Sequence, residues 1–200
     1  MSINNITLTF FPIGLEYLKN YFISAIGAEY DVCYIDYYKE SISNYYIQQY
    51  NAPQIKFLLF APQSNPHTTI MFANIMDGYT SLIKYVSRIY NNMEYYTISI
   101  SDGTSQMMNA YHFQYYAQSK QRHILCYQDP QWVFFEDGEP LWFEDVTHYK
   151  QRLKKNRLNK SIILEYLKSL GWEIDKEDFW LPSTGFYEFS KQGCATRHTI

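Results

Sequence analysis

Residues 132–172 read WVFFEDGEPLWFEDVTHYKQRLKKNRLNKSIILEYLKSLGW. An aromatic strand pattern comes first, and an acidic turn, a second aromatic step and a basic run follow it. The stretch ends in apolar residues at helical spacing, and Gly171 suits the position just after a helix. We therefore expect a strand over 132–136, a helix over about 146–157, and a second helix from near Asn159 or Ser161 to Gly171.

The upstream sequence adds more strands than helices. Strands are expected at 5–11, 32–38, 56–61, 68–73, 95–101, 110–117 and 123–127, and helices at 15–26 and 79–90. Short turns join the last strands into a β-meander. The expected class is α+β, with a mixed or antiparallel sheet, helices packed on a face, and the late β-meander followed by two C-terminal helices. We expect one domain over 1–189 and a flexible C-terminal tail over 190–200.

The composition suits a folded domain. Of 200 residues, 46% are hydrophobic and 18% are charged, which allows a sizeable core and disfavours disorder. The three cysteines form no CxxC pair, so neither a disulfide framework nor a zinc knuckle is expected. There is no apolar run near the ~20 residues that a membrane helix needs, and the first residues lack a basic leader pattern. These features predict a cytoplasmic protein without a membrane partner.

The catalytic motifs that sequence patterns can reveal are missing. The chain has no GxSxG, GxGxxG, GxxxxGK[ST] or HExxH pattern, so we predict neither a cofactor nor a catalytic residue. His112 and His123 lie on neighbouring expected strands and could face each other as a weak metal pair. A hydrolase that uses these histidines and a carboxylate is therefore the alternative function. The favoured interpretation is that both histidines are structural or lie on the surface. We therefore expect a protein without enzymatic activity.

Two charged segments remain as candidate binding surfaces. Glu136, Asp137 and Glu139 crowd a Gly-Glu-Pro turn, and Trp142 follows; together they form a candidate partner-binding surface. A basic run over 150–160 could contact nucleic-acid phosphates. Because the net charge is −3, a solvated helix face paired with the acidic turn is the favoured interpretation of this run, and a nucleic-acid partner is not expected.

The opening stretch resembles a group of small uncharacterised bacterial proteins. In that group a W-x-F-x-E-x-G strand is followed by P-L-x-F-E, a tyrosine, a basic R-L stretch and a helix that ends in L-G. The matching residues here are Trp132, Phe134, Glu136, Gly138, Pro140, Leu141, Phe143, Glu144, Tyr149, Arg152, Arg157, Leu158, Tyr166, Leu167, Leu170 and Gly171. Such proteins look similar to immunity-like partners of bacterial toxins. The resemblance implies a non-enzymatic protein that neutralises a toxin through its acidic, aromatic-flanked surface.

Overall fold

A computed structural model describes residues 3–36, 42, 54–91, 93–103, 108–118 and 120–191. Within these ranges the chain forms an antiparallel sheet with strand order β2-β9-β3-β4-β1-β5-β6-β7-β8. The strands are β1 (Asn5–Phe11), β2 (Tyr30–Ile35), β3 (Lys56–Pro62), β4 (Thr69–Ala73), β5 (Tyr95–Ser101), β6 (Ala110–Ala117), β7 (Lys120–Asp129), β8 (Gln131–Asp137) and β9 (Pro182–Lys191). The helices are α1 (Leu15–Ile26), α3 (Thr80–Ile89) and α4 (Lys160–Ser169), with 3₁₀ turns η1 (Gly27–Glu29), η2 (His148–Lys150), η3 (Lys154–Asn156) and η4 (Asp178–Trp180). The expected α+β class is confirmed.

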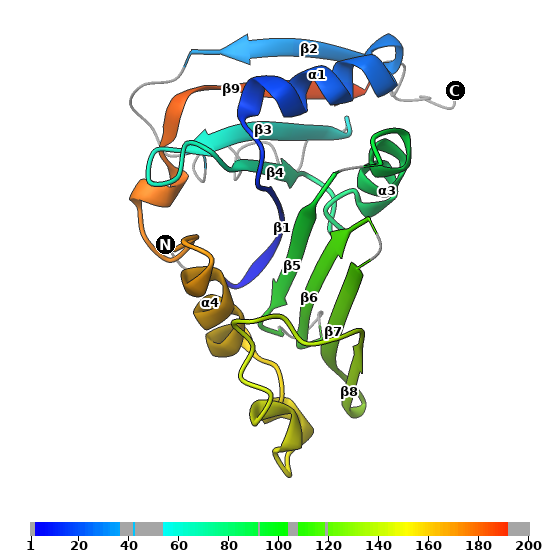
Figure 1. Ribbon diagram of the computed structural model, residues 1–200, viewed down its shortest axis with the longest axis vertical. Coiled ribbons are helices and arrows are strands. Elements are labelled where there is room, and N and C mark those ends of the chain that lie inside the picture. Colours follow the sequence, from blue (N-terminus) through cyan, green and yellow to red (C-terminus); the bar gives the residue numbers. More distant parts are fainter. Residues whose placement is uncertain are drawn as a thin grey trace, which may run out of the picture.

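Helices cover both faces of the sheet, not one face as expected. Figure 1 shows α4 on one side of β1 and β5, and α3 on the other side. The continuous apolar run of β3 follows from this arrangement. Leu58 and Phe60 join the core under α4, whereas Phe57 and Leu59 join the core under α1 and α3. A strand that is buried on both faces needs no polar alternation.

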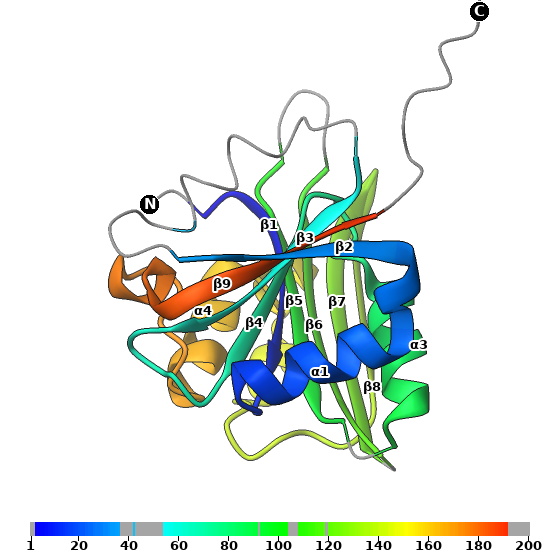
Figure 2. The same ribbon diagram turned by 90° about the horizontal axis from the view of Figure 1, so that it is seen from above.

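The direction of the strands turns strongly across the sheet. Figure 2 shows β2 and β9 crossing the direction of β5–β8. A right-handed twist between neighbouring strands accumulates in this way over a wide sheet. The late strands β5, β6, β7 and β8 pair in sequence order, which is the expected meander.

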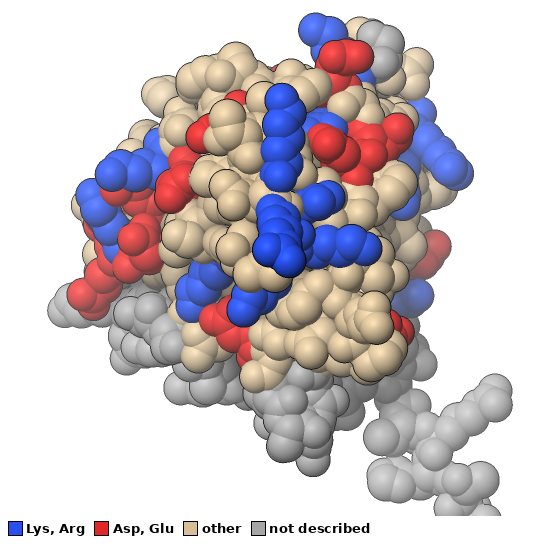
Figure 3. All heavy atoms as spheres, turned by 90° about the horizontal axis from the view of Figure 1, so that it is seen from below, with Lys and Arg blue, Asp and Glu red and all other residues tan. Residues whose placement is uncertain are grey.

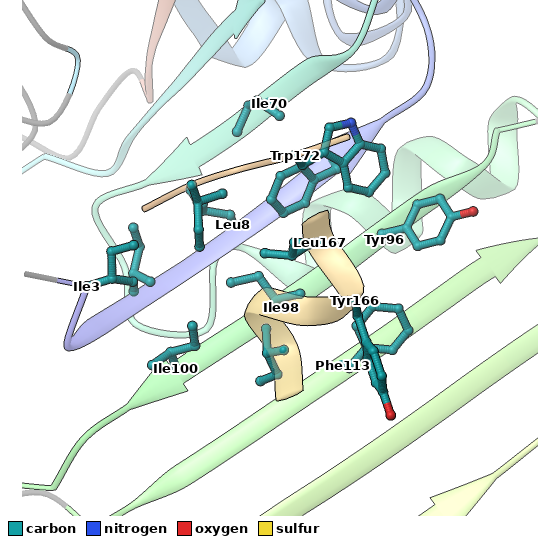
Figure 4. Packing of buried hydrophobic residues seen from close by; sticks show 14 of the residues in the cluster. Ile3, Leu8, Ile70, Tyr96, Ile98, Ile100, Phe113, Tyr166, Leu167 and Trp172 are labelled. Atoms are coloured by element: carbon teal, nitrogen blue, oxygen red, sulfur yellow. The ribbon is translucent and has the colours of Figure 1, made fainter. Parts of the chain in front are cut away.

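Helix α4 covers one of the two hydrophobic cores, and capping interactions define both of its ends. The Asn159 side chain accepts a hydrogen bond from the backbone N–H of Ile162 at 3.1 Å and so caps the first turn. At the other end Gly171 has φ +80°, and the N–H of Trp172 reaches back to Leu167 O at 2.8 Å. The Trp172 ring then stacks on Phe10 with centroids 4.6 Å apart. Figure 4 shows Leu167 and Trp172 among the apolar side chains of β1, β4 and β5.

The expected helix over 146–157 is wrong. Two 3₁₀ turns, η2 and η3, occupy this stretch. Within it only Tyr149 is buried, at 7% exposure, and the next buried residue is Leu158, at 0%. Since they lie nine residues apart, no apolar stripe exists to hold a helix on the core.

The strand β9 was not expected, and it lies inside the sheet between β2 and β3. Ser190 and Lys191 were assigned to the flexible tail, but they pair with Asp31 and Tyr30 of β2. The rest of the expected tail, 192–200, lies outside the described residues. Within the described part of the chain, no helix combines the length and apolar character that crossing a membrane requires.

Candidate functional site

A buried arginine organises the acidic segment. Arg122 lies on β7, where Ile124 and Cys126 continue the same inward-facing alternation, and its side chain is 1% exposed. Its guanidinium donates to both oxygens of Glu144, at 2.8 to 3.1 Å, and to Glu136 Oε2 at 2.7 Å. Burying a guanidinium is costly unless charge and hydrogen bonds compensate it, and here both do.

Glu144 is the buried counter-charge, with a fully buried side chain. Besides the guanidinium, it accepts from the backbone N–H of Leu141 at 2.9 Å and from the Tyr149 hydroxyl at 2.6 Å. Because that hydroxyl has a single proton, the 2.7 Å contact between the Tyr149 and Tyr166 hydroxyls is donated by Tyr166. We call Arg122, Glu136, Glu144, Tyr149 and Tyr166 the Arg122 network.

The pKa values in this network favour fixed protonation states. Burial, with the hydrogen bond donated to Glu144, raises the pKa of the Tyr149 phenol far above its ordinary value. Burial raises the pKa of Tyr166 to about 12. Burial alone would lower the pKa of Arg122, but hydrogen bonds to Glu144 and Glu136 outweigh it and raise that pKa. Arg122 therefore stays charged, and the phenols of Tyr149 and Tyr166 stay protonated, across the physiological pH range.

The turn after β8 depends on a glycine. Gly138 has φ +83°, and a Cβ added there would lie 2.0 Å from Gln121 O. Its own carbonyl accepts from Arg122 Nη1 at 2.7 Å. The reversal expected at Gly138 is thus tied directly to the buried arginine.

The four candidate partner-binding residues split into two groups. The Glu136 side chain is 39% exposed and already binds Arg122, so it is less available than the sequence indicated. Asp137 and Glu139 are exposed, and neither forms an ion pair with a described residue. Trp142 is 79% exposed, the highest exposure among the large hydrophobic side chains described.

The loop that carries Trp142 is held on both sides. Leu141 is fixed by its hydrogen bond to Glu144, and Phe143 packs edge-on against Phe113 at 5.9 Å. The indole of Trp142 itself touches Phe143 in a T-shaped contact at 5.4 Å. An exposed indole therefore stands on a fixed base.

The two candidate metal histidines do meet, on the opposite face of β6 and β7 from the Arg122 network. Their ring centroids are 4.8 Å apart in a T-shaped contact. The buried Nε2 of His112 has no hydrogen-bond partner, and the described residues contain no group of three His, Cys, Asp or Glu side chains able to hold a metal. Burial, and then the nearby His123 and Lys84, lowers the pKa of His112 to about 4. Burial also lowers the pKa of His123. The pair is neutral at pH 7. Asp137 lies opposite His123 in the register of β7 and β8, and its charge partly offsets the lowering of the His123 pKa, but the described residues form no three-ligand group here.

Surface hollows lie elsewhere. One of about 450 Å³ is lined by Tyr21, Tyr90 and Met93, and another of about 560 Å³ by Tyr17, Tyr34 and Tyr187. Neither is lined by a histidine or a cysteine, so neither holds a nucleophile–base pair of the common kind.

Arg122 was not among the residues predicted for the site. The signal was present, because Arg122 alternates with Ile124 and Cys126 and so shares their inward-facing side of the strand. A charge in register with a core face needs a buried counter-charge, and Glu144 supplies it.

Comparison of the chain with family models, curated proteins and solved structures finds no match.

Proposed function

We propose that this chain is a non-enzymatic protein-binding protein of the immunity type, which neutralises a basic bacterial toxin. The binding surface consists of Trp142, Asp137 and Glu139, with Glu136 at its edge. The observation that carries the proposal is the 79% exposure of Trp142 on a loop that the Arg122 network fixes.

A fixed, exposed indole suits a binding anchor. Tryptophan is enriched among residues that dominate binding energy, because it buries a large area with few rotatable bonds. The flanking residues Leu141 and Phe143 are already packed, so little backbone freedom remains to be lost on binding. Leaving such a ring in water without a partner gains nothing for folding.

The charge around this anchor favours a basic partner. The exposed carboxylates of Asp137 and Glu139 have no described counter-ion, and they lie within five residues of Trp142 in the chain. Unpaired acids beside an anchor steer a basic protein towards it and accelerate association. The buried pair of Arg122 and Glu144 contributes to the surface only by holding it.

The test is co-expression of the chain with the products of its neighbouring genes. We expect one neighbour to arrest growth when expressed alone, and co-expression of this chain to relieve the arrest and yield a stable complex. Trp142→Ala should weaken the complex by at least about tenfold and restore the arrest.

The matched control is Tyr17→Ala, which removes an exposed aromatic ring (69% exposed) from α1 on the other side of the sheet. Rescue should survive this change. If no neighbour forms a complex, the proposed function is wrong. A complex that Trp142→Ala leaves intact would instead place the binding site elsewhere.

A further inference from the structure

The basic loop, residues 150–157, is an uncompensated positive surface. Lys150, Arg152, Lys154 and Lys155 are all exposed within it. Figure 1 places this segment at the lower end of the molecule, and Figure 3, which looks at that end, shows Lys and Arg side chains gathered near its middle. We propose that the basic loop binds the phosphate backbone of a nucleic acid, at a surface distinct from that of Trp142.

The acids expected to neutralise this loop form no ion pair with it, and the exposed Asp137 and Glu139 form none with any described residue. Glu136 and Glu144 bind Arg122. Asp145 accepts from the backbone N–H of Thr147 at 2.9 Å and lies 3.8 Å from His148. The solvated, acid-paired helix favoured by the sequence is therefore absent on both counts, since neither the helix nor the pairing forms.

Nothing in the described chain replaces those acids. The four exposed cations of the basic loop make no ion pair with any described residue. Like charges at this spacing repel one another, and a polyanion removes the repulsion while it releases its own counterions. The net charge of −3 does not oppose this, because screening confines the field of each surface to about 10 Å at 0.1 M salt.

The loop is held in shape before any ligand arrives. Tyr149 and Leu158 anchor its two ends in the core. Between them Arg157 Nε donates to Gln151 O at 2.9 Å, and its guanidinium lies 5.5 Å from the centre of the Phe134 ring. Cations on a fixed loop lose less entropy on binding than cations on a free tail.

The surroundings favour a nucleic acid over a membrane. A membrane-surface segment needs a broad apolar face beside its cations, and the basic loop forms 3₁₀ turns, not an amphipathic helix. Leu153, at 54% exposure, is the single exposed large apolar side chain described within it. Since no exposed aromatic ring in the basic loop can stack on a base, binding should depend on phosphates and show little sequence preference.

The experiment is fluorescence anisotropy with a labelled single-stranded DNA of about 20 nucleotides and with the matching duplex. Four phosphate contacts predict that the affinity for the single strand falls about 50-fold between about 50 and 200 mM salt, and that for the duplex about 150-fold. Lys154→Glu with Lys155→Glu should weaken binding at least about tenfold at the lower salt concentration.

The matched control reverses two exposed lysines outside the loop, Lys120→Glu with Lys168→Glu, and should change the affinity by less than about twofold. If the first pair unfolds, as circular dichroism would show, Lys150→Gln with Arg152→Gln takes its place. Trp142→Ala should leave DNA binding intact, which separates this surface from the protein-binding one. Absence of binding at the lower salt concentration, equal losses in both variant pairs, or binding to anionic vesicles but not to DNA would each overturn the proposal.

Discussion

The buried polar groups on the two faces of strands β6 and β7 differ in how completely they are hydrogen-bonded. On the face towards α4, Arg122 is 1% exposed and meets two carboxylates and two backbone carbonyls. On the other face His112 is buried with its Nε2 unpartnered, next to a second neutral histidine. The completed network supports a loop that displays Trp142, whereas the histidine pair belongs to no three-ligand group among the described residues. The contrast shows that a buried charge on these strands is held by a complete set of partners, whereas a buried neutral imidazole is left without a hydrogen bond on one nitrogen.

The largest expected loss of stability comes from removing the charge of Arg122, on the face of the sheet towards α4. Arg122→Met leaves Glu144 buried without its counter-ion, and we expect a loss of about 3 to 5 kcal/mol in the free energy of unfolding. The stability of Arg122→Lys should lie between those of the wild type and Arg122→Met. One ammonium group keeps the charge but cannot replace the planar guanidinium that reaches Glu136, Glu144 and Gly138 together. Urea unfolding measures both variants. An Arg122→Met protein as stable as the wild type would show that the network contributes nothing.

The contribution of the buried His112 to folding stability should depend on pH. The folded-state pKa of His112 is about 4, below its ordinary 6.5, so the unfolded chain takes up this proton first as pH falls. Its contribution to stability is therefore complete above pH 6.5 and is lost progressively towards pH 4, by at most about 3 kcal/mol. Carboxylates also titrate in this window, so the informative quantity is the difference between wild type and His112→Phe.

We expect His112→Phe to lose less stability than the wild type between pH 7 and pH 4.5, as measured by urea unfolding at each pH. His67→Asn alters an exposed histidine and should behave as the wild type does. Parallel pH profiles for the wild type and His112→Phe would contradict the assignment of a buried neutral imidazole.

The smallest expected stability change is that of Glu136→Gln, and it distinguishes Glu136 from Glu144, the other carboxylate bound to Arg122. Glu136→Gln alters a group that is 39% exposed, so solvent screening limits its cost to under about 1 kcal/mol. Glu144→Gln alters a fully buried group and should cost about 3 kcal/mol. Equal costs measured by urea unfolding would mean that burial does not distinguish these two partners.

Much of the sheet follows from local patterns, and the exceptions have physical causes. Strand β5 was predicted from the alternation of residues 95–101, and β3 from the apolar run of residues 56–61. Both predictions are confirmed because the local pattern agrees with the burial of these strands in the fold. β9 escaped detection, since an inner strand containing Pro182 and Gly185 has neither strong alternation nor a continuous apolar run. The helix over 146–157 was wrong because its charge pattern carried no buried stripe.

The candidate site was predictable only in part. Asp137, Glu139 and Trp142 are exposed as the turn chemistry indicated, but Glu136 turned out to bind a residue fourteen positions away. Pairing of that kind depends on strand register, which sequence patterns leave open. Whether these residues bind a partner is a prediction for the co-expression experiment.

A double-mutant cycle on Arg122 and Glu144 tests most directly whether a buried ion pair holds the Trp142 loop. The four proteins are the wild type, Arg122→Met, Glu144→Gln and the double variant, and the quantity measured is the free energy of unfolding in urea. We predict a coupling energy of about 2 kcal/mol or more between the two positions, because each single change strands a buried polar partner that the double change removes. Effects that add to within about 0.5 kcal/mol would contradict this account of the loop.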